Sequence, residues 1–423
     1  MTTENPRDAL EPVAGNGLLH RRLFLTHGVA AGAALLTATA TRAAPLDVPA
    51  SMKTPGAPMS EYGERSAHEA RVKRIVAGAP PSTGTGSSRT PLESLEGVVT
   101  PSSLHFERHH NGVPDLDPDT HQVLIHGLVE RPLLFSIDAL SRYPLVSRIQ
   151  FLECSGNSAG NNAPEPPQQS AGGLHGLVSC SDWTGVPLAI LLEEAGLKPE
   201  GRWLLAEGAD AAGMSRSVPV AKALDDAILA LYQNGERLRP SNGYPVRLFL
   251  PGYEGNMNVK WLRRIKVTAE PTMTKDETSK YSDLGLDGRA KLFTFPMEVK
   301  SVITSPSGGQ KMKAAGLYQI SGLAWSGFGK IRRVEVSADG GKSWAHAALT
   351  EPVLSKSLVR FRMPWRWNGN PSVLMSRAVD ETGAVQPTRA ALMAARGANY
   401  RYHYNAIQSW NVSGAGEIGN VYV

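Results

Sequence analysis

The C-terminal third of the chain, from Met297 onward, consists of short stretches in which apolar and polar residues alternate. Alternation with a period of two predicts half-buried strands, and Asp339-Gly340 is typical of a hairpin turn. The 42 glycines and 30 prolines also favour turns and short strands over a helix bundle. This pattern predicts an immunoglobulin-like sandwich over residues 291–423. Besides the hairpin, strands are expected at 317–320, 358–363 and 373–379.

The length and composition are those of an ordinary globular protein. The chain has 423 residues, of which 41% are hydrophobic and 20% are charged. This is enough to bury a full core, and the length corresponds to about two or three domains. The formal net charge is only +5, and no stripe of lysine and arginine with interleaved aromatic residues is present. Nucleic acid is therefore not expected as a partner.

The first 44 residues have the features of an export signal. The stretch from His20 to Thr26 is similar to a twin-arginine motif, a mildly apolar run follows over 29–40, and small residues end it at Ala43-Ala44. The run is too short for a stable membrane span, which needs about 20 apolar residues. We therefore expect twin-arginine export to a bacterial periplasm, with a disordered basic tail as the alternative. Residues 45–95 are rich in Pro, Gly, Ser and Thr, which predicts an extended linker.

A cysteine stands where the apolar run Gln150–Leu152 passes into a turn-rich segment that ends at Asn162. A loop of this composition can direct several N–H groups toward one point and so lower the pKa of the Cys154 thiol. Such a thiolate is either a nucleophile or a ligand for a soft metal, whereas the alternative is a small buried side chain. Two cysteines do not make a four-ligand zinc site. We expect both to be reduced and Cys180 to lie in the core.

Three histidines occur within six residues, at His105, His109 and His110. A helix would place the first two on one face, as in a zinc site, but Asn111-Gly112 and Pro114 favour a strand that leads into a turn. The alternative for each is a solvated loop side chain.

Positive charges stand in apolar surroundings farther along the chain. Arg247 lies within an apolar strand, where an unpaired guanidinium is costly, so an anionic partner is expected. Lys260 supplies a second positive charge, and structural ion pairs are the alternative for both. Ser215 and Ser217 are candidate phosphate donors. A helix is predicted from Trp183 through Ala195, followed by a strand at 203–206.

These segments together resemble the sulfite oxidase family, over about residues 90–423. The matching stretches are Glu153-Cys154-Ser155-Gly156-Asn157, Phe106-x-Arg108-x-His110, Gly243-x-Pro245-x-Arg247, Val259-Lys260-Trp261, Tyr281 and Ala378-Val379-Asp380. The resemblance implies an α+β fold, with a molybdopterin-binding domain at 96–290 and a dimerisation domain at 291–423. It also implies that the immunoglobulin-like sandwich forms a homodimer.

The resemblance also implies the roles of individual residues. Cys154 would ligate the molybdenum of one molybdopterin per chain, Arg108 would hold the substrate, and Tyr281 would bind the transferred oxygen. The family commonly has a histidine where this chain has Asn242, which leaves the cofactor contact of that residue open. The implied cofactor-binding residues are Phe106, His109, His110, Cys154, Asn242, Arg247 and Lys260.

One departure from the family concerns the substrate. Sulfite oxidases generally carry an arginine five residues after the cysteine, whereas this chain has Ala159. The chain is most similar to the sulfane dehydrogenase branch, which oxidises sulfur bound to a SoxYZ-like carrier protein and passes electrons to a SoxD-like cytochrome c. Such a haem partner must be separate, because the chain has no Cys-x-x-Cys-His motif. The alternatives are a free-sulfite dehydrogenase, a non-catalytic exported binding protein and a cysteine hydrolase.

The segment Gly414-x-Gly416-x-x-Gly419 has the spacing of a dinucleotide-binding fingerprint. Only four residues follow it, so no strand and helix can complete the motif. We therefore expect it to be a turn.

Overall fold

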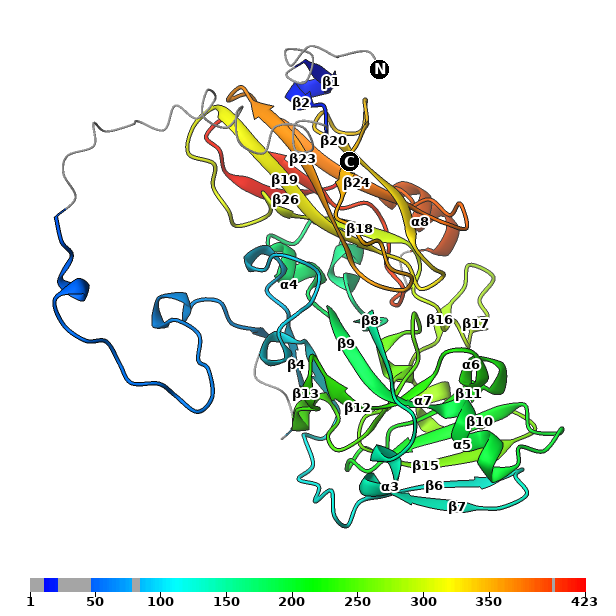
Figure 1. Ribbon diagram of the computed structural model, residues 1–423. Helices are drawn as coiled ribbons and strands as arrows, with labels where there is room; N and C mark the ends of the chain where they lie inside the picture. Colours follow the sequence, from blue (N-terminus) through cyan, green and yellow to red (C-terminus); the bar gives the residue numbers. More distant parts are fainter. Residues whose placement is uncertain (1–10, 22–46, 78–83, 398–399) are drawn as a thin grey trace, which may run out of the picture.

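The computed structural model describes residues 11–21, 47–77, 84–397 and 400–423, and it shows two stacked bodies (Figure 1). A mixed body of sheets and short helices contains most of residues 84–297, and a β-sandwich contains residues 298–423. The mostly sheet structure with few helices confirms the predicted α+β class. Residues 1–10 and 22–44 of the predicted export signal lie outside the described residues. No helix in the described ranges is long and apolar enough to cross a membrane.

Two five-stranded sheets with short helices form the mixed body. Its largest apolar core lies between these sheets and the helices α5 and α6. The first sheet has the order β11 (Ser215–Pro219), β10 (Trp203–Gly208), β15 (Leu262–Thr268), β6 (Gln122–Gly127) and β7 (Leu133–Ser136). The second has the order β13 (Glu236–Arg237), β12 (Ile228–Gln233), β9 (Val178–Pro187) and β8 (Val146–Glu153), with β14 (Arg247–Phe249) also paired to β12. The helices are α3 (Ile137–Ser141), α4 (Ala171–His175), α5 (Leu188–Ala195), α6 (Val220–Asp225) and α7 (Lys275–Thr278).

The helix predicted from Trp183 begins later, at Leu188. Residues 183–187 instead continue β9, where they pair with β8 on one side and β12 on the other. Pairing on both sides of a buried strand outweighs the helical spacing of the apolar residues. Gly196, with a φ of 72°, ends α5 as predicted.

A small third sheet carries one wall of the site described below. It has the order β3 (Ile75–Ala77), β4 (Gly86–Arg89) and β5 (Glu107–His109). Because β4 lies within the range predicted as a linker and Leu92 just after it is buried, that range is not extended linker throughout. Its C-terminal part belongs to the folded body. The strand predicted around the three histidines is β5, and it leads into a turn as expected.

The sandwich consists of two antiparallel sheets, which confirms the predicted strands and hairpin. One sheet contains β1 (Pro12–Ala14), β2 (Leu18–Leu19), β23 (Val359–Trp367), β19 (Gly316–Trp325) and β18 (Lys300–Ser305), with β22 (Ala348–Leu349) also on β23. The other contains β21 (Ala345–His346), β20 (Ile331–Ser337), β24 (Ser372–Asp380), β25 (Ser409–Val412) and β26 (Ile418–Val421). Helix α8 (Arg389–Arg396) lies beside the second sheet. The glycine-rich stretch before β26 forms a turn between β25 and β26, so it binds no dinucleotide.

The two bodies share a core. Phe151 of β8 and Cys180 of β9 pack in one apolar cluster with Trp325 of the sandwich. Strand β8 ends at Glu153, so the cysteine loop that follows it begins at the junction of the two bodies (Figure 1). The sandwich is therefore a separate domain that also packs against the strand from which the cysteine loop emerges. Two minor strands, β16 (Asp283–Leu284) and β17 (Ala290–Lys291), connect the bodies in sequence.

Candidate active site

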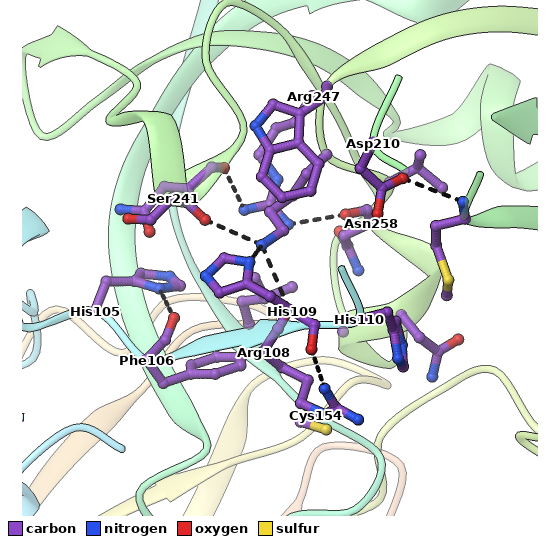
Figure 2. A pocket seen from close by; sticks show the side chains of 18 of the residues that line it. His105, Phe106, Arg108, His109, His110, Cys154, Asp210, Ser241, Arg247 and Asn258 are labelled. Atoms are coloured by element: carbon purple, nitrogen blue, oxygen red, sulfur yellow. Dashed lines mark hydrogen bonds between the residues drawn. The ribbon is translucent and has the colours of Figure 1, made fainter. Parts of the chain in front are cut away.

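A single pocket collects most of the residues that the sequence singled out (Figure 2). It lies between β5, the loop after β8, the turn before β14 and the segment that contains Tyr281. Predicted residues that line it are Phe106, Arg108, His109, His110, Cys154, Asn242, Arg247, Lys260 and Tyr281. Further lining residues include His105, Asp210, Met214, Ser241, Asn256, Asn258 and Trp261.

The backbone of the cysteine loop is held on several sides. The N–H of Cys154 donates to the carbonyl of Leu177 at 2.9 Å, and the N–H of Asn157 donates to the carbonyl of Cys154 at 2.9 Å. Ser158 adopts a φ of 69°, an uncommon conformation for a residue with a side chain. A side chain at Gly255 would approach the Cys154 Cα to 3.2 Å, so the loop lies tightly against its neighbour. The thiol is therefore fixed in position at the edge of the pocket.

The pKa of the Cys154 thiol differs from the expectation. Burial raises this pKa, and the Gly156 N–H and the Arg108 guanidinium only partly offset the effect. The prediction of a pKa lowered by local donors is therefore wrong for the chain without a bound metal, because desolvation outweighs those donors. Cys180 is free and fully buried as expected, and burial raises its pKa to about 11.

Arg108 and Tyr281 line the same side of the pocket as the cysteine. The Arg108 guanidinium donates to the carbonyls of His109 and Gly86, and it forms no ion pair among the described residues. The Tyr281 hydroxyl lies 3.1 Å from Nε2 of His110. Burial raises the pKa of Tyr281 well above its usual value, so the phenol is protonated and can donate a hydrogen bond.

Two further basic residues line the pocket, the buried Arg247 and the half-buried Lys260. Arg247 is 3% exposed and donates to the carbonyls of Asn242 and Asn258, at 2.9 Å each, while its Nε has no partner. Lys260 donates to the carbonyl of Ser241 at 3.0 Å. Neither cation forms an ion pair with a described carboxylate within 4 Å. Burial lowers the pKa of Arg247 to about 9, and burial together with the Arg247 charge lowers the pKa of Lys260 well below its usual value.

The histidines of the pocket are neutral. His109 Nδ1 accepts from Lys260 Nζ at 2.8 Å, while Nε2 lies 3.3 Å from Glu107. Burial, with Lys260 as the next cause, lowers the pKa of His109 to about 3, and burial lowers that of His110 to about 4. His105 is fully buried beside Phe106, with a pKa lowered to about 3 by burial and no partner at Nε2. The histidines face different neighbours, and no group of three metal-binding side chains occurs among the described residues, so they do not form a zinc site.

Asn242 and Phe106 support the pocket through the backbone. The side-chain amide of Asn242 donates to Gln233 at 2.8 Å. The backbone carbonyl of Asn242 accepts a hydrogen bond from the Arg247 guanidinium. The N–H of Phe106 donates to Ser179 at 3.0 Å and its ring stacks on His105. Both residues line the cavity with apolar or backbone atoms close to the charged groups.

Two predicted contacts are absent from the pocket. Ser215 and Ser217 do not line it, because the Ser217 hydroxyl donates to the Thr272 carbonyl at 3.0 Å and both serine N–H groups donate to carboxylates of α7. They are therefore not phosphate donors here. Ala159 also lies outside the lining, half-buried at the start of the turn after Ser158.

The residues present fit an anionic cofactor that brings its own metal donors. Buried cations without a carboxylate, together with the unpartnered Arg247 Nε and His105 Nε2, suit a phosphate group. Cys154 supplies one soft sulfur, as a molybdenum ligand requires. With no three-ligand cluster in the described part of the chain, the protein offers this one donor and the remaining donors would come from the cofactor.

Comparisons with known proteins agree with this geometry. The model of the oxidoreductase molybdopterin-binding domain matches residues 110–275, and that of the Mo-co oxidoreductase dimerisation domain matches residues 291–410. The sulfite oxidase of Gallus gallus is 30% identical over 335 residues, which are 72% of each chain. The crystal structure of the sulfane dehydrogenase SoxCD from Paracoccus pantotrophus is 44% identical, with a TM-score of 0.87, and covers 89% of this chain and 98% of that one.

Some relatives are longer than this chain. The mitochondrial sulfite oxidase of Homo sapiens is 30% identical, and this chain spans 60% of it. The NADH nitrate reductase of Ulva prolifera is also 30% identical, and the chain spans 34% of it. Relatives of this kind disfavour the binding-protein and hydrolase alternatives. The chain belongs to the sulfite oxidase family of molybdenum oxidoreductases, and its cofactor is molybdenum bound to molybdopterin.

Proposed function

We propose that this chain is a SoxC-like molybdenum subunit of a periplasmic sulfane dehydrogenase. It would oxidise sulfane sulfur on a SoxYZ-like carrier protein during thiosulfate oxidation and pass electrons to a SoxD-like cytochrome c. The proposal is supported by the 44% identity over 98% of the sulfane dehydrogenase chain, against 30% for the sulfite oxidases. A free-sulfite dehydrogenase is the second candidate, because sulfite oxidases also match over most of this chain.

The observation that carries the choice of substrate is the charge around the thiol. Arg108 is a cation of the pocket near Cys154 that has no carboxylate partner in the described part of the chain. The Arg216 guanidinium lies 4.8 Å from the Tyr281 ring, but it is ion-paired at 3.0 Å with Glu277 and at 3.3 Å with Glu254. A small dianion such as sulfite gains from every cation, whereas sulfur on a carrier arm gains contacts along the arm. The charge of Arg89 also acts on Cys154, but Arg89 does not line the pocket. A single guanidinium without a carboxylate partner beside the thiol, among the described residues that line the pocket, suits the second case better.

The chain's own groups orient the substrate. When bound, molybdopterin-held molybdenum supplies two-electron oxidation coupled to transfer of an oxygen atom, and Cys154 would be its protein ligand. Arg108 would attract the anionic end of the substrate and hold the sulfur at the pocket side of the thiol. The Tyr281 hydroxyl stays protonated and would donate a hydrogen bond to the oxygen that is transferred to the substrate sulfur, which develops negative charge. His110 would fix the orientation of this phenol through its contact at 3.1 Å.

Location and assembly follow from other parts of the chain. The twin-arginine-like motif supports export of a folded, cofactor-loaded protein to the periplasm. The match to a dimerisation domain supports homodimerisation through the sandwich. The sulfane dehydrogenase of Paracoccus pantotrophus is a SoxCD complex, which supports a SoxD-like second subunit for this chain. Purification with the natural partner, followed by measurement of molybdenum and haem, tests this composition.

The substrate is tested by placing a second arginine where sulfite oxidases generally have one. We expect Ala159→Arg to raise kcat/KM for free sulfite and to lower it for carrier-bound sulfur. One charge-assisted contact is worth about 1.5–3 kcal/mol, or roughly a ten- to hundredfold change. Both constants are measured at one ionic strength, with Ala390→Arg on the exposed face of α8 as the control for added charge. An unchanged ratio of the two constants for Ala159→Arg would argue against the pocket-charge explanation.

The role of the thiol is tested separately. Cys154→Ser is expected to abolish turnover with either substrate while the fold is retained, because an oxygen donor is a poor replacement for a thiolate on a soft metal. Cys180→Ser is the matched control, since this second cysteine lies in the core away from the pocket. Near wild-type turnover of the Cys154→Ser variant would refute the ligand role.

A further inference from the structure

The segment just before the twin-arginine-like motif is docked on the edge of the sandwich (Figure 1). β1 and β2 form a short hairpin, and Leu18 pairs with Trp365 of β23. Leu18 and Leu19 are 0% and 1% exposed, as deeply buried as residues of the domain core. Burying two leucine side chains favours docking and opposes the cost of ordering the segment.

Directed contacts fix the register of this segment. The Trp365 Nε1 donates to the carbonyl of Asn16 at 2.7 Å, and the Asn16 amide donates to the carbonyl of Ala338 at 2.8 Å. The N–H of Gly15 donates to the Ser343 hydroxyl at 2.7 Å. These partners come from β23 of one sheet and from the loop after β20, which is a strand of the other sheet. They are brought together only when the sandwich is folded.

A glycine is required at the closest approach. Gly17 has a φ of 83°, and a Cβ at this position would lie 2.2 Å from the carbonyl oxygen of Arg366. No side chain fits there without displacing β23. Gly15–Gly17 form a tight turn that brings β2 against this edge, and β2 ends two residues before Arg21, which is exposed.

We propose that residues 12–19 are a folding-dependent latch that anchors the basic export motif on the completed sandwich. The edge of β23 is the acceptor surface, and its occupant is this segment of the same chain. Because the contacts need β23 and the loop after β20 in their folded positions, the latch closes only after the C-terminal domain has folded. A receptor that takes the motif as an extended peptide must then displace the strand. The inference uses the export signal of the proposed function, but docking itself needs neither the cofactor nor a sulfur substrate.

Hydrogen exchange of the full chain tests the latch. In the wild type, the amides of residues 12–19 are expected to exchange at least about tenfold more slowly than in Leu18→Asp, which places a charge in the buried slot. Gly17→Ala, which adds no charge, should give the same loss of protection. Val13→Asp is the matched control, because Val13 is 41% exposed in the same segment and should leave exchange unchanged.

Two further readouts decide the function of the docking. Trypsin cleavage after Arg21 should be about tenfold faster in Leu18→Asp than in Val13→Asp, with unchanged molybdenum content in both. In urea, protection of residues 12–19 should disappear together with that of β23. Equal exchange in the wild type and Leu18→Asp would overturn the latch, as would loss of its protection well below the unfolding of the sandwich. A chain that docks but is not exported would instead contradict the proposed location.

Discussion

Positive charges inside this chain differ in their partners between the base of the cysteine loop, where Lys300 lies, and the pocket, where Arg247 and Lys260 lie. At the base of the cysteine loop, Lys300 Nζ lies 2.6 Å from Glu153 Oε1. The other carboxylate oxygen of Glu153 accepts a hydrogen bond from the Trp325 indole at 2.6 Å. In the pocket, Arg247 is buried and Lys260 is half-buried, yet their partners are backbone carbonyls and a histidine. The charge of Lys300 is neutralised by a carboxylate of the chain, whereas Arg247 and Lys260 have no such carboxylate among the described residues.

The difference separates structural charges from functional ones. A buried ion pair needs nothing more, and its contribution to the free energy of folding is small because desolvation offsets the attraction. A buried cation without an anion is costly and tolerable only when another component compensates for it. The Lys300–Glu153 pair thus fixes the base of the cysteine loop, whereas we propose that Arg247 and Lys260 would hold an anionic group such as the pterin phosphate.

The largest effect is expected when one partner of the neutralised pair is removed. Lys300→Met leaves Glu153 buried without a cation, and the free energy of unfolding should fall by about 3–5 kcal/mol. Lys311→Met is the control, because Lys311 forms an exposed pair with Glu417 and should change stability by about 0–1 kcal/mol. Urea unfolding of both variants measures this. Equal effects of the two substitutions would erase the distinction between buried and exposed pairs.

A second effect concerns pH. Burial, with Lys300 as the next cause, lowers the pKa of His175 to about 3, and the residue bridges Ser158 and Gln408 at 2.7 and 3.0 Å. Because the folded pKa lies below the unfolded value, the unfolded chain binds the extra proton. Stability is thus fully present above about pH 6.5 and is lost as the pH falls toward 3, by up to about 1.4 kcal/mol per pH unit for this group.

Acid should also destabilise the chain through the pocket histidine His109, because the pKa of this residue is likewise lowered to about 3. An anion bound near Lys260 would raise that pKa, so the cofactor-loaded chain should lose less stability in acid than the cofactor-free chain. His175, which faces the neutralised group, should contribute equally in both. Unfolding free energies at pH 7 and 5.5 for wild type and His175→Gln measure the two parts. A cofactor-free chain with the same acid sensitivity as the loaded chain would count against an anion near His109.

The smallest change in the free energy of unfolding is expected when the unpaired Arg247 is replaced in the cofactor-free chain. Arg247→Met removes an uncompensated charge but leaves two carbonyls without donors, so the two terms oppose each other. The free energy of unfolding should change by no more than about 1–2 kcal/mol, well below the effect of Lys300→Met. Chain produced without molybdopterin is the sample. A loss as large as that of Lys300→Met would mean that Arg247 is a structural residue.

The sequence was informative about side chains that carry the chemistry. Cys154, Arg108 and Tyr281 are separated by up to 173 positions in number, but each stands in a recognisable local pattern, and the structure brings all three to one pocket. The strands of the sandwich were also predictable, because alternation of apolar residues depends on local period alone.

The missed features depend on contacts that local patterns do not encode. The carbonyl groups that hold Arg247 belong to Asn242 and Asn258, and a backbone carbonyl leaves no mark in residue type. The pairing of Glu153 with Lys300 joins two bodies of the fold, so neither residue has a sequence signal of its own. Likewise, the burial of Leu18 requires the edge of β23 near the other end of the chain.

If the unpaired cations of the pocket bind the cofactor, replacing Arg247 should lower the amount of bound molybdopterin. The molybdopterin content of Arg247→Met measures this directly. Arg360→Met is the matched control, since Arg360 is also buried and donates to the carbonyls of Leu95 and Gly97, but it lies in the sandwich. We expect molybdenum and pterin per chain to fall by about ten- to a hundredfold at limiting cofactor in Arg247→Met and to stay at the wild-type level in Arg360→Met. Wild-type cofactor content in Arg247→Met would contradict the claim.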